Sequence, residues 1–308
     1  MNEQLKEQDF SLKPDFSLKP DLKFSEDEQG LKFIEIDNAF ATAKIALQGA
    51  HIMQWQPKSA AHPVLWLSSQ ARFVQGRSIR GGVPICWPWF GAHPTDSSYC
   101  THGFARVIPW ELTDAETLRN GATRLVLHML ETDESKRQLS YPFSLSVTIT
   151  IGETLKIDLS TTNKANHPFM IGEAFHTYFN ISDIDQIKVT GLDDALYSDK
   201  VFQYERRVQS SDIKFKGEFD RVYLNTTTDC VIEDAGLNRK IRIGKSGSSS
   251  TVVWTPGVEK ARQMGDMGTE HEWRTMICVE NANALENSVV VNPNHTHTLT
   301  AEYSVEDL

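Results

Sequence analysis

Hydrophobic and polar residues alternate along most of this chain with a period of two. The clearest runs are residues 31–36, 124–129, 144–151, 154–159, 186–190, 240–244, 251–254 and 298–303. These runs are rich in β-branched residues and are separated by Gly, Asn, Asp and Pro, which is typical of strands joined by turns. Patterns of amphipathic helices are scarce. The chain is therefore predicted to be all-β, a sandwich or barrel with few short helices.

Residues 29–308 are expected to form one domain, because they contain no Gly- or Ser-rich linker long enough to divide them. The segment Gly247-Ser-Ser-Ser250 is short enough to be a turn between two strands. The N-terminus differs, since the hexapeptide Asp-Phe-Ser-Leu-Lys-Pro occurs at 9–14 and again at 15–20. Each proline limits helix formation, and two copies are too few for a repeat architecture. We predict a flexible N-terminal tail over residues 1–28.

Composition excludes several classes of protein. The net charge of −10 opposes a general affinity for nucleic acid, whose binders usually present a basic face. No run approaches the ~20 apolar residues of a membrane helix, and the polar start lacks the order of a secretory signal. The four cysteines are widely spaced, which is typical of reduced thiols in the cytoplasm. We expect a cytoplasmic protein without nucleic-acid or membrane partners, and nothing in the sequence demands more than a monomer.

Two neighbouring segments combine residue types that suit few chemistries: SIRGGVPICWPWFG at 78–91 and HGFAR at 102–106. The paired glycines allow positive φ or a close backbone approach, and the Trp and Phe rings offer flat apolar faces. Arg80 and Arg106 carry planar guanidinium groups suited to phosphate or carboxylate. In an acidic protein, an anion must be bound by such local cations. The segments therefore predict a pocket for a ligand with an apolar face and an anionic end, such as a sugar phosphate.

Three further residues are candidates for chemistry. His176, within the aromatic segment EAFHTYF at 173–179, is either a core histidine bonded to the backbone or a general acid. Glu280 ends an apolar run, and is either solvated or, if partly buried, a base with a raised pKa. Asp220 is either a turn residue or surface partner of Arg221, or a group that binds sugar hydroxyls. The residues alone leave these alternatives open.

No motif for a nucleotide or a metal is present. The chain lacks a Walker motif and a dinucleotide fingerprint. His295 and His297 lie two apart, but no third ligand at a typical metal spacing accompanies them. Asp266 is most simply a turn residue. We therefore expect neither a metal nor an organic cofactor.

Seven segments in order resemble the aldose 1-epimerase (mutarotase) superfamily, and especially its hexose-6-phosphate branch, the glucose-6-phosphate 1-epimerases. They are QGAH at 48–51, IRGGVP at 79–84, HGFAR at 102–106, FHTYF at 175–179, DRVY at 220–223, WTPG at 254–257 and MICVE at 276–280. The likeness covers about residues 31–305. It implies a β-supersandwich of the galactose mutarotase type, with the active site in a cleft on one face.

The resemblance also implies roles for individual residues. By motif, the general acid is His176 and the general base is Glu280. The implied substrate-binding residues are the phosphate-binding pair Arg80 and Arg106, the sugar-binding Asp220, and the second substrate-contacting histidine, His102. Some relatives carry Gln directly before that histidine, where this chain has Thr101, so the chain departs from the pattern at one expected contact.

The implied activity is that of an isomerase that interconverts the α and β anomers of a hexose 6-phosphate, in the first place glucose 6-phosphate. Acid–base ring opening and reclosure would need no cofactor. Two alternatives stay open. A non-catalytic carbohydrate-binding or sugar-phosphate-sensing module would share the arginines and aromatic residues, but His176 and Glu280 would not need to titrate. An aldose 1-epimerase for neutral sugars would differ only in its substrate.

Overall fold

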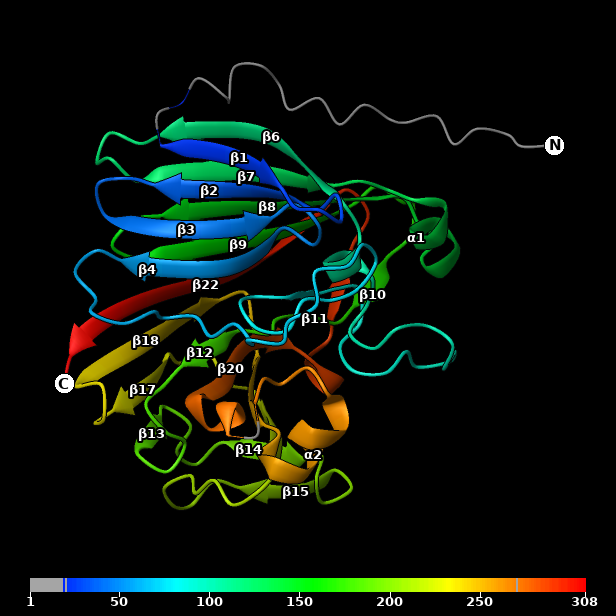
Figure 1. The fold of residues 1–308 in the computed structure, drawn as a ribbon. Coiled ribbons are helices and arrows are strands. Elements are labelled where there is room, and N and C mark those ends of the chain that lie inside the picture. Colours follow the sequence, from blue (N-terminus) through cyan, green and yellow to red (C-terminus); the bar gives the residue numbers. More distant parts are fainter. Residues whose placement is uncertain (1–18, 20, 270) are drawn as a thin grey trace.

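The structure is a computed structural model that describes residues 19, 21–269 and 271–308. Its regular secondary structure consists mainly of antiparallel strands, so the all-β prediction is confirmed (Figure 1). Apart from Lys19, the repeated hexapeptide lies outside the described residues. The strand β1 begins at Leu22, within the stretch 1–28 that we predicted to be a tail. That boundary is corrected, because residues 22–26 pair with the neighbouring strand.

One eight-stranded sheet has the order β13-β17-β18-β22-β9-β8-β7-β6. Its strands are β6 (Trp110–Thr117), β7 (Thr123–Met129), β8 (Phe143–Ile151), β9 (Leu155–Asn163), β13 (Ile187–Thr190), β17 (Cys230–Asp234), β18 (Arg239–Ser246) and β22 (Thr296–Asp307). Buried and partly exposed residues alternate without a break along β8, because every second side chain faces the core. The period of two seen in the sequence therefore has a direct structural cause.

A four-stranded sheet lies in the same half of the molecule as β6–β9 (Figure 1). Its strands are β1 (Leu22–Glu26), β2 (Lys32–Asp37), β3 (Ala41–Ala46) and β4 (His51–Pro57). Most apolar side chains of this sheet share one core cluster with those of β7, β8 and β9. Asn38 also joins the two sheets, since its Nδ2 donates to the carbonyl of Ile151 at 2.9 Å.

The second eight-stranded sheet has the order β15-β14-β16-β19-β20-β11-β5, and β12 also pairs with β20. Its strands are β5 (Ile85–Cys86), β11 (Glu173–Phe175), β12 (Tyr178–Asn180), β14 (Leu196–Asp199), β15 (Glu205–Val208), β16 (Phe219–Leu224), β19 (Ser250–Thr255) and β20 (Met276–Asn283). Every residue of β19 and β20 is buried, because both faces of these strands are covered. The central position of β20 makes it the reference for the site described below.

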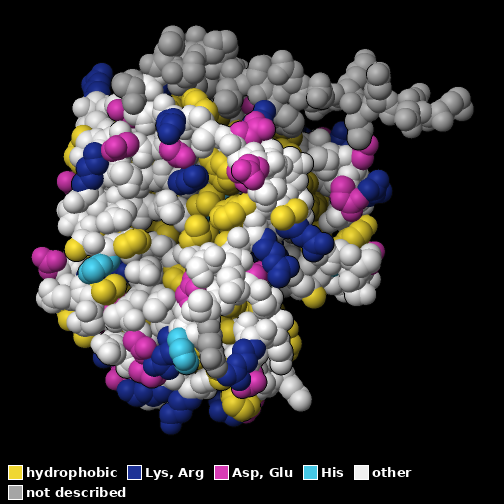
Figure 2. Space-filling model, viewed as in Figure 1, with side chains coloured by type: hydrophobic (Ala, Val, Ile, Leu, Met, Phe, Trp, Pro, Cys, Tyr) yellow, Lys and Arg dark blue, Asp and Glu magenta, His cyan; other side chains and the backbone are white. Residues whose placement is uncertain are grey.

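Few other elements complete the fold. Strands β10 (Phe169–Ile171) and β21 (Val289–Val291) form a small sheet, and the helices of the described residues are α1 (Asp133–Gln138), α2 (Gly257–Met264) and the 3-10 turns η2 (Ala105–Val107), η3 (Glu272–Thr275) and η4 (Leu285–Asn287). None of the helices in the described part of the chain is long and apolar enough to cross a membrane. On the face drawn in Figure 2, acidic and basic side chains are interspersed and hydrophobic ones gather near the middle.

Candidate active site

A cleft of about 480 Å³ opens beside the second eight-stranded sheet. The residues predicted for catalysis and substrate binding all line it: Arg80, His102, Arg106, His176, Asp220 and Glu280. A larger groove of about 740 Å³ lies along the four-stranded sheet, but its lining contains neither histidine nor arginine. The candidate chemistry is therefore concentrated in the smaller cleft.

Strand pairing places His176 beside Glu280. Antiparallel pairing puts Phe175 of β11 opposite Asn281 of β20, and Tyr178 of β12 opposite Cys278. His176 occupies the break between β11 and β12, so its side chain meets the β20 face that carries Glu280. The distance from His176 Nδ1 to Glu280 Oε1 is 3.4 Å. Residues more than one hundred positions apart thus form an acid–base pair on a rigid sheet.

Aromatic rings fix the orientation of the imidazole. The His176 ring stacks on Tyr178 with centroids 4.9 Å apart and an interplanar angle of 10°, and it meets the edge of Trp254 at 5.8 Å. Apart from the Glu280 carboxylate, the buried Nδ1 of His176 has no hydrogen-bond partner among the described residues. Glu280 Oε2 is likewise buried without a partner among them. Buried polar groups are almost always satisfied, so these two atoms need an explanation, and a role in proton transfer would supply one. The core histidine with a backbone partner is the weaker interpretation.

Burial shifts the pKa values of the pair in opposite directions. It raises the pKa of Glu280 well above its usual range, against the opposing charge of Lys200. It lowers the pKa of His176 well below 6.5, and the charge of Arg106 adds to this effect. Both shifts favour the neutral forms, because a low-dielectric site disfavours charge. A carboxyl group with a raised pKa is a stronger base once it is ionised, as a general base requires.

Arg80 is held by two partners. Its Nε lies 3.1 Å and its Nη2 3.3 Å from the two carboxylate oxygens of Asp266, while Nη1 donates to the Tyr178 hydroxyl at 2.9 Å. The simple turn role expected for Asp266 is incomplete, because its carboxylate forms this bidentate ion pair. Sequence spacing gave no sign of it, since the two residues lie 186 positions apart.

Arg106 has no carboxylate partner among the described residues. It lies in η2, and its Nη2 donates to the carbonyl oxygen of Thr101 at 2.7 Å. Thr101 therefore orients the guanidinium through its backbone, although it replaces the Gln of some relatives. Because no carboxylate neutralises Arg106, its charge is available to an anion in the cleft.

Two lysines of the cleft were missed by sequence reasoning. Lys200 lies 3.2 Å from Asp220 Oδ2, and Lys260 forms an ion pair with Glu218. The other oxygen of Asp220, Oδ1, is buried and has no hydrogen-bond partner in the described part of the chain. Burial raises the pKa of Asp220, and Lys200 opposes that shift. No local motif marks these lysines, because their partners lie on other elements.

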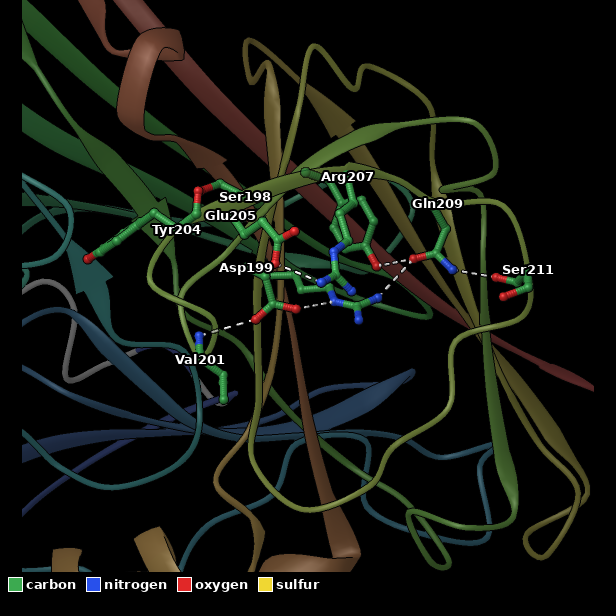
Figure 3. A network of polar contacts seen from close by, with 10 residues as sticks. Ser198, Asp199, Val201, Tyr204, Glu205, Arg207, Gln209 and Ser211 are labelled. Atoms are coloured by element: carbon green, nitrogen blue, oxygen red, sulfur yellow. Dashed lines mark hydrogen bonds and ion pairs between the residues drawn. The ribbon is translucent and has the colours of Figure 1, made fainter.

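A polar network around Asp199 and Gln209 lies next to Lys200 and Asp220 in the sequence (Figure 3). Arg221, the residue after Asp220, donates from Nε to Asp199 Oδ2 at 2.9 Å and from Nη1 to Gln209 Oε1 at 3.2 Å. The Arg221 guanidinium also packs between the Tyr197 and Phe219 rings. Of the alternatives left open for Asp220, a surface pair with Arg221 does not occur, because Arg221 pairs with Asp199 and Asp220 with Lys200. Successive residues of a strand point to opposite faces of its sheet, so Arg221 joins the network while Asp220 points to the cleft.

The glycines of the IRGGVP segment have the positive φ that was predicted, 111° for Gly81 and 62° for Gly82. A Cβ on Gly82 would lie 2.3 Å from the carbonyl oxygen of Ile52, so this backbone is tightly packed. The ring of His51 supports the same loop, with Nε2 2.8 Å from the Gly81 carbonyl oxygen. Of the aromatic residues that follow, Trp87 is fully buried in the core, while Phe90 lines the cleft.

His102 lies beside the catalytic candidates. Its φ is 65°, and its ring meets that of His176 edge to face with centroids 5.5 Å apart. The Gly91 amide donates to its Nδ1 at 3.4 Å. Burial lowers the pKa of His102 well below 6.5, so the ring is neutral near pH 7 and offers a hydrogen bond rather than a charge.

Comparisons with known proteins agree with this site and fold. A protein of Escherichia coli K12, named as a candidate glucose-6-phosphate 1-epimerase, is 37% identical over 87% of this chain and 88% of its own length. A protein of Cenchrus ciliaris with the same name is 35% identical over 82% of this chain and 77% of its own length. The crystal structure of a candidate mutarotase from Salmonella typhimurium superimposes with a TM-score of 0.87 and 32% identity, covering 94% of this chain and 95% of that one.

The mutarotase likeness confirms the predicted β-supersandwich fold. The sequence profile of the aldose 1-epimerase family matches residues 32–304, which is nearly all of the described structure. This match and the relatives above 30% identity lead to the same assignment. The chain belongs to the aldose 1-epimerase family.

Proposed function

We propose that this protein is an isomerase that interconverts the α and β anomers of a hexose 6-phosphate, in the first place glucose 6-phosphate. The observation that carries the proposal is the buried pair of His176 and Glu280, 3.4 Å apart, in a cleft that also presents Arg106. The names of the relatives support the same substrate class. An acid, a base and an anion-binding group are the parts this reaction needs.

Ring opening uses the two members of the pair in turn. The Glu280 carboxylate removes the proton of the anomeric hydroxyl while His176 protonates the ring oxygen, and the bond between C1 and O5 breaks. Rotation about the C1–C2 bond of the open-chain aldehyde presents its other face. The roles then reverse: His176 takes the proton back from the O5 hydroxyl, O5 attacks C1, and Glu280 returns its proton to the new anomeric oxygen. Each positioned acid or base contributes about 10²–10⁴-fold to the rate.

The pKa shifts match the middle of this cycle. After ring opening Glu280 is protonated and His176 is neutral, which are the forms that burial favours for each residue. In the open-chain state each member of the buried pair is therefore uncharged, which limits the cost of forming it. The reaction needs no group beyond these side chains and the substrate.

The cations of the cleft select the substrate. The phosphate lies away from C1 in the sugar, so it orients the ring without taking part in the chemistry. Arg106 supplies the principal charge, and Arg80, held by Asp266, supplies a fixed donor fork. Asp220, with its unpartnered Oδ1, is placed to accept from sugar hydroxyls.

A panel of substrates and variants tests the proposal. Pure anomers of glucose 6-phosphate, galactose 6-phosphate and free glucose are dissolved with wild type, His176→Ala or Glu280→Gln, and anomerisation is followed by polarimetry. We expect wild type to accelerate the sugar phosphates most and both variants to lose that acceleration. Tight binding by wild type without acceleration would instead assign a sensing module. Equal acceleration of glucose and the phosphates would assign a mutarotase for neutral sugars.

The proposed substrate also indicates the cellular compartment in which the enzyme acts. Phosphorylated hexoses are intracellular metabolites, and the four cysteines are free thiols in the structure, as expected for a reducing compartment. We therefore propose that the protein acts in the cytoplasm. The cleft is built from one chain, so a monomer carries every group that the mechanism uses.

A further inference from the structure

A third donor atom accompanies the proposed acid–base pair. Cys278 lies two residues before Glu280 on β20, so the two side chains share one face of that strand. A ring nitrogen of His176, the Sγ of Cys278 and a carboxylate oxygen of Glu280 all lie within 4.8 Å of one another. The proposed reaction makes no use of this thiol, which is fully buried and does not line the cleft.

We propose that these three side chains form a binding site for a thiophilic divalent cation, Zn²⁺ in the first place, and that its occupancy inhibits the enzyme. In a tetrahedral zinc site with bonds of about 2.0–2.3 Å, neighbouring donor atoms lie roughly 3.3–3.8 Å apart. The 3.4 Å between His176 Nδ1 and Glu280 Oε1 falls within that range. The sulfur has to approach by about 1 Å at most, which rotation of short side chains can supply.

Two unsatisfied atoms give independent support. His176 Nδ1 and Glu280 Oε2 are buried and lack hydrogen-bond partners among the described residues. His176 is 8% exposed and Glu280 1%, so neither atom is satisfied by bulk water. A cation accepts lone pairs from several ligand atoms at once, so one ion would satisfy both atoms together. Strand pairing already holds the three donors in place, so little ordering is needed on binding.

Charge and ligand softness favour zinc over the harder dications. One Zn²⁺ with a carboxylate, a thiolate and a neutral imidazole forms a site with no net charge, which is the least costly state for a buried group. Thiolate and imidazole ligands select zinc rather than Mg²⁺ or Ca²⁺, which prefer oxygen. Binding releases the Cys278 thiol proton and the proton of the Glu280 carboxyl to solvent, so affinity rises with pH. The three protein ligands leave a fourth position that faces the cleft, from which the ion enters.

The inhibitory effect rests on the proposed function. A bound ion would occupy the His176 nitrogen and the Glu280 carboxylate together, so neither could exchange a proton with the sugar. Zinc and the sugar phosphate should therefore compete. The binding itself does not depend on the function, which allows the two to be tested separately.

The first experiment measures binding without activity. Chelator-treated protein is titrated with Zn²⁺ by calorimetry, and with Cd²⁺ by the ultraviolet charge-transfer band of a cadmium–thiolate bond. We expect one ion per chain and a thiolate band in wild type. Cys278→Ala and Cys278→Ser should lose that band and bind zinc at least about 10–100-fold more weakly. Cys100→Ser, which removes the exposed thiol, is the matched control and should behave as wild type.

The second experiment measures anomer exchange of glucose 6-phosphate during a Zn²⁺ titration. Wild type and Cys100→Ser should lose activity, while Cys278→Ala should be active without metal and resist zinc. Unchanged zinc affinity in both Cys278 variants, or a wild-type protein without the thiolate band, would overturn the site. Zinc that binds but accelerates exchange would overturn its inhibitory role. A protein that binds zinc but never accelerates exchange would contradict the proposed function and leave the site standing.

Discussion

Arg106→Ala should change the substrate preference of the enzyme more than its chemistry. Arg106 has no carboxylate partner among the described residues, whereas Arg80 is held by Asp266. Removing Arg106 therefore removes the principal uncompensated positive charge of the cleft, which we propose binds the phosphate. A hydrogen bond to a charged group contributes about 1.5–3 kcal/mol. Because Arg106 is partly exposed, solvent screening argues for the lower part of that range, about 1.5–2 kcal/mol.

This energy corresponds to a loss of roughly 10–30-fold in kcat/KM for glucose 6-phosphate, at 1.36 kcal/mol for each factor of ten. Free glucose carries no phosphate, so its kcat/KM should stay within about twofold. Arg106→Lys keeps the charge but not the planar fork, and should lie between wild type and Arg106→Ala. Anomerisation of both sugars, followed by polarimetry over a range of concentrations, gives these values.

The control is Arg119→Ala. It removes the same charge from an exposed arginine in the turn between β6 and β7, outside the cleft. It should leave both sugars unaffected, which separates a local contact from a change in net charge. Equal losses on the two sugars, or full activity of Arg106→Ala on the phosphate, would refute the assignment of Arg106 to phosphate binding.

Three other substitutions have definite expected outcomes. Glu280→Gln should lower kcat by about 10²–10⁴-fold and leave calorimetric affinity for the sugar phosphate within a few-fold; unchanged kcat would remove Glu280 from the chemistry. Gly103→Ala places a Cβ 1.9 Å from the Trp87 carbonyl oxygen, whereas a Cβ at Gly91, which also has positive φ, meets nothing within 4 Å. In urea unfolding, Gly103→Ala should therefore be less stable than Gly91→Ala by ~1–3 kcal/mol. Equal stability of the two variants would contradict the packing. Burial lowers the pKa of His297, but the Glu173 carboxylate at 2.7 Å outweighs it and the net direction is up. The folded pKa exceeds the unfolded one, so this stabilisation is present below about pH 6.5 and is lost as pH rises through the folded pKa; His297→Gln should therefore destabilise the fold more at about pH 6 than at about pH 9, and a pH-independent loss would contradict the pair.

Most of the fold could be predicted from the sequence because its signal is local. Every alternating run named above overlaps an observed strand, since a half-buried strand must place every second side chain toward the core. The predicted boundary of the N-terminal tail was wrong because the local signal is weak there. Leu22–Glu26 is an edge strand of only five residues, so the alternation of Leu22 and Phe24 with polar residues is a weak signal, and its pairing with β2 reveals it.

The residues of the candidate site also differ in whether the local sequence marks them. Its predicted residues lie in contiguous segments whose composition suggested chemistry. The segments around Lys200, Lys260 and Asp266 carry no such signal, because the roles of these residues arise from ion pairs with distant elements. Periodicity does not specify which loop ends meet across a cleft, so Asp266 could be recognised as the partner of Arg80 only in three dimensions.

Two-dimensional exchange NMR on glucose 6-phosphate at anomeric equilibrium tests the central claim most directly. It reports interconversion itself, without a coupling enzyme. Catalytic amounts of wild type should produce strong cross-peaks between the α and β C1 protons, and His176→Ala and Glu280→Gln should leave only the spontaneous rate. Spontaneous-rate exchange with properly folded wild type would contradict the account.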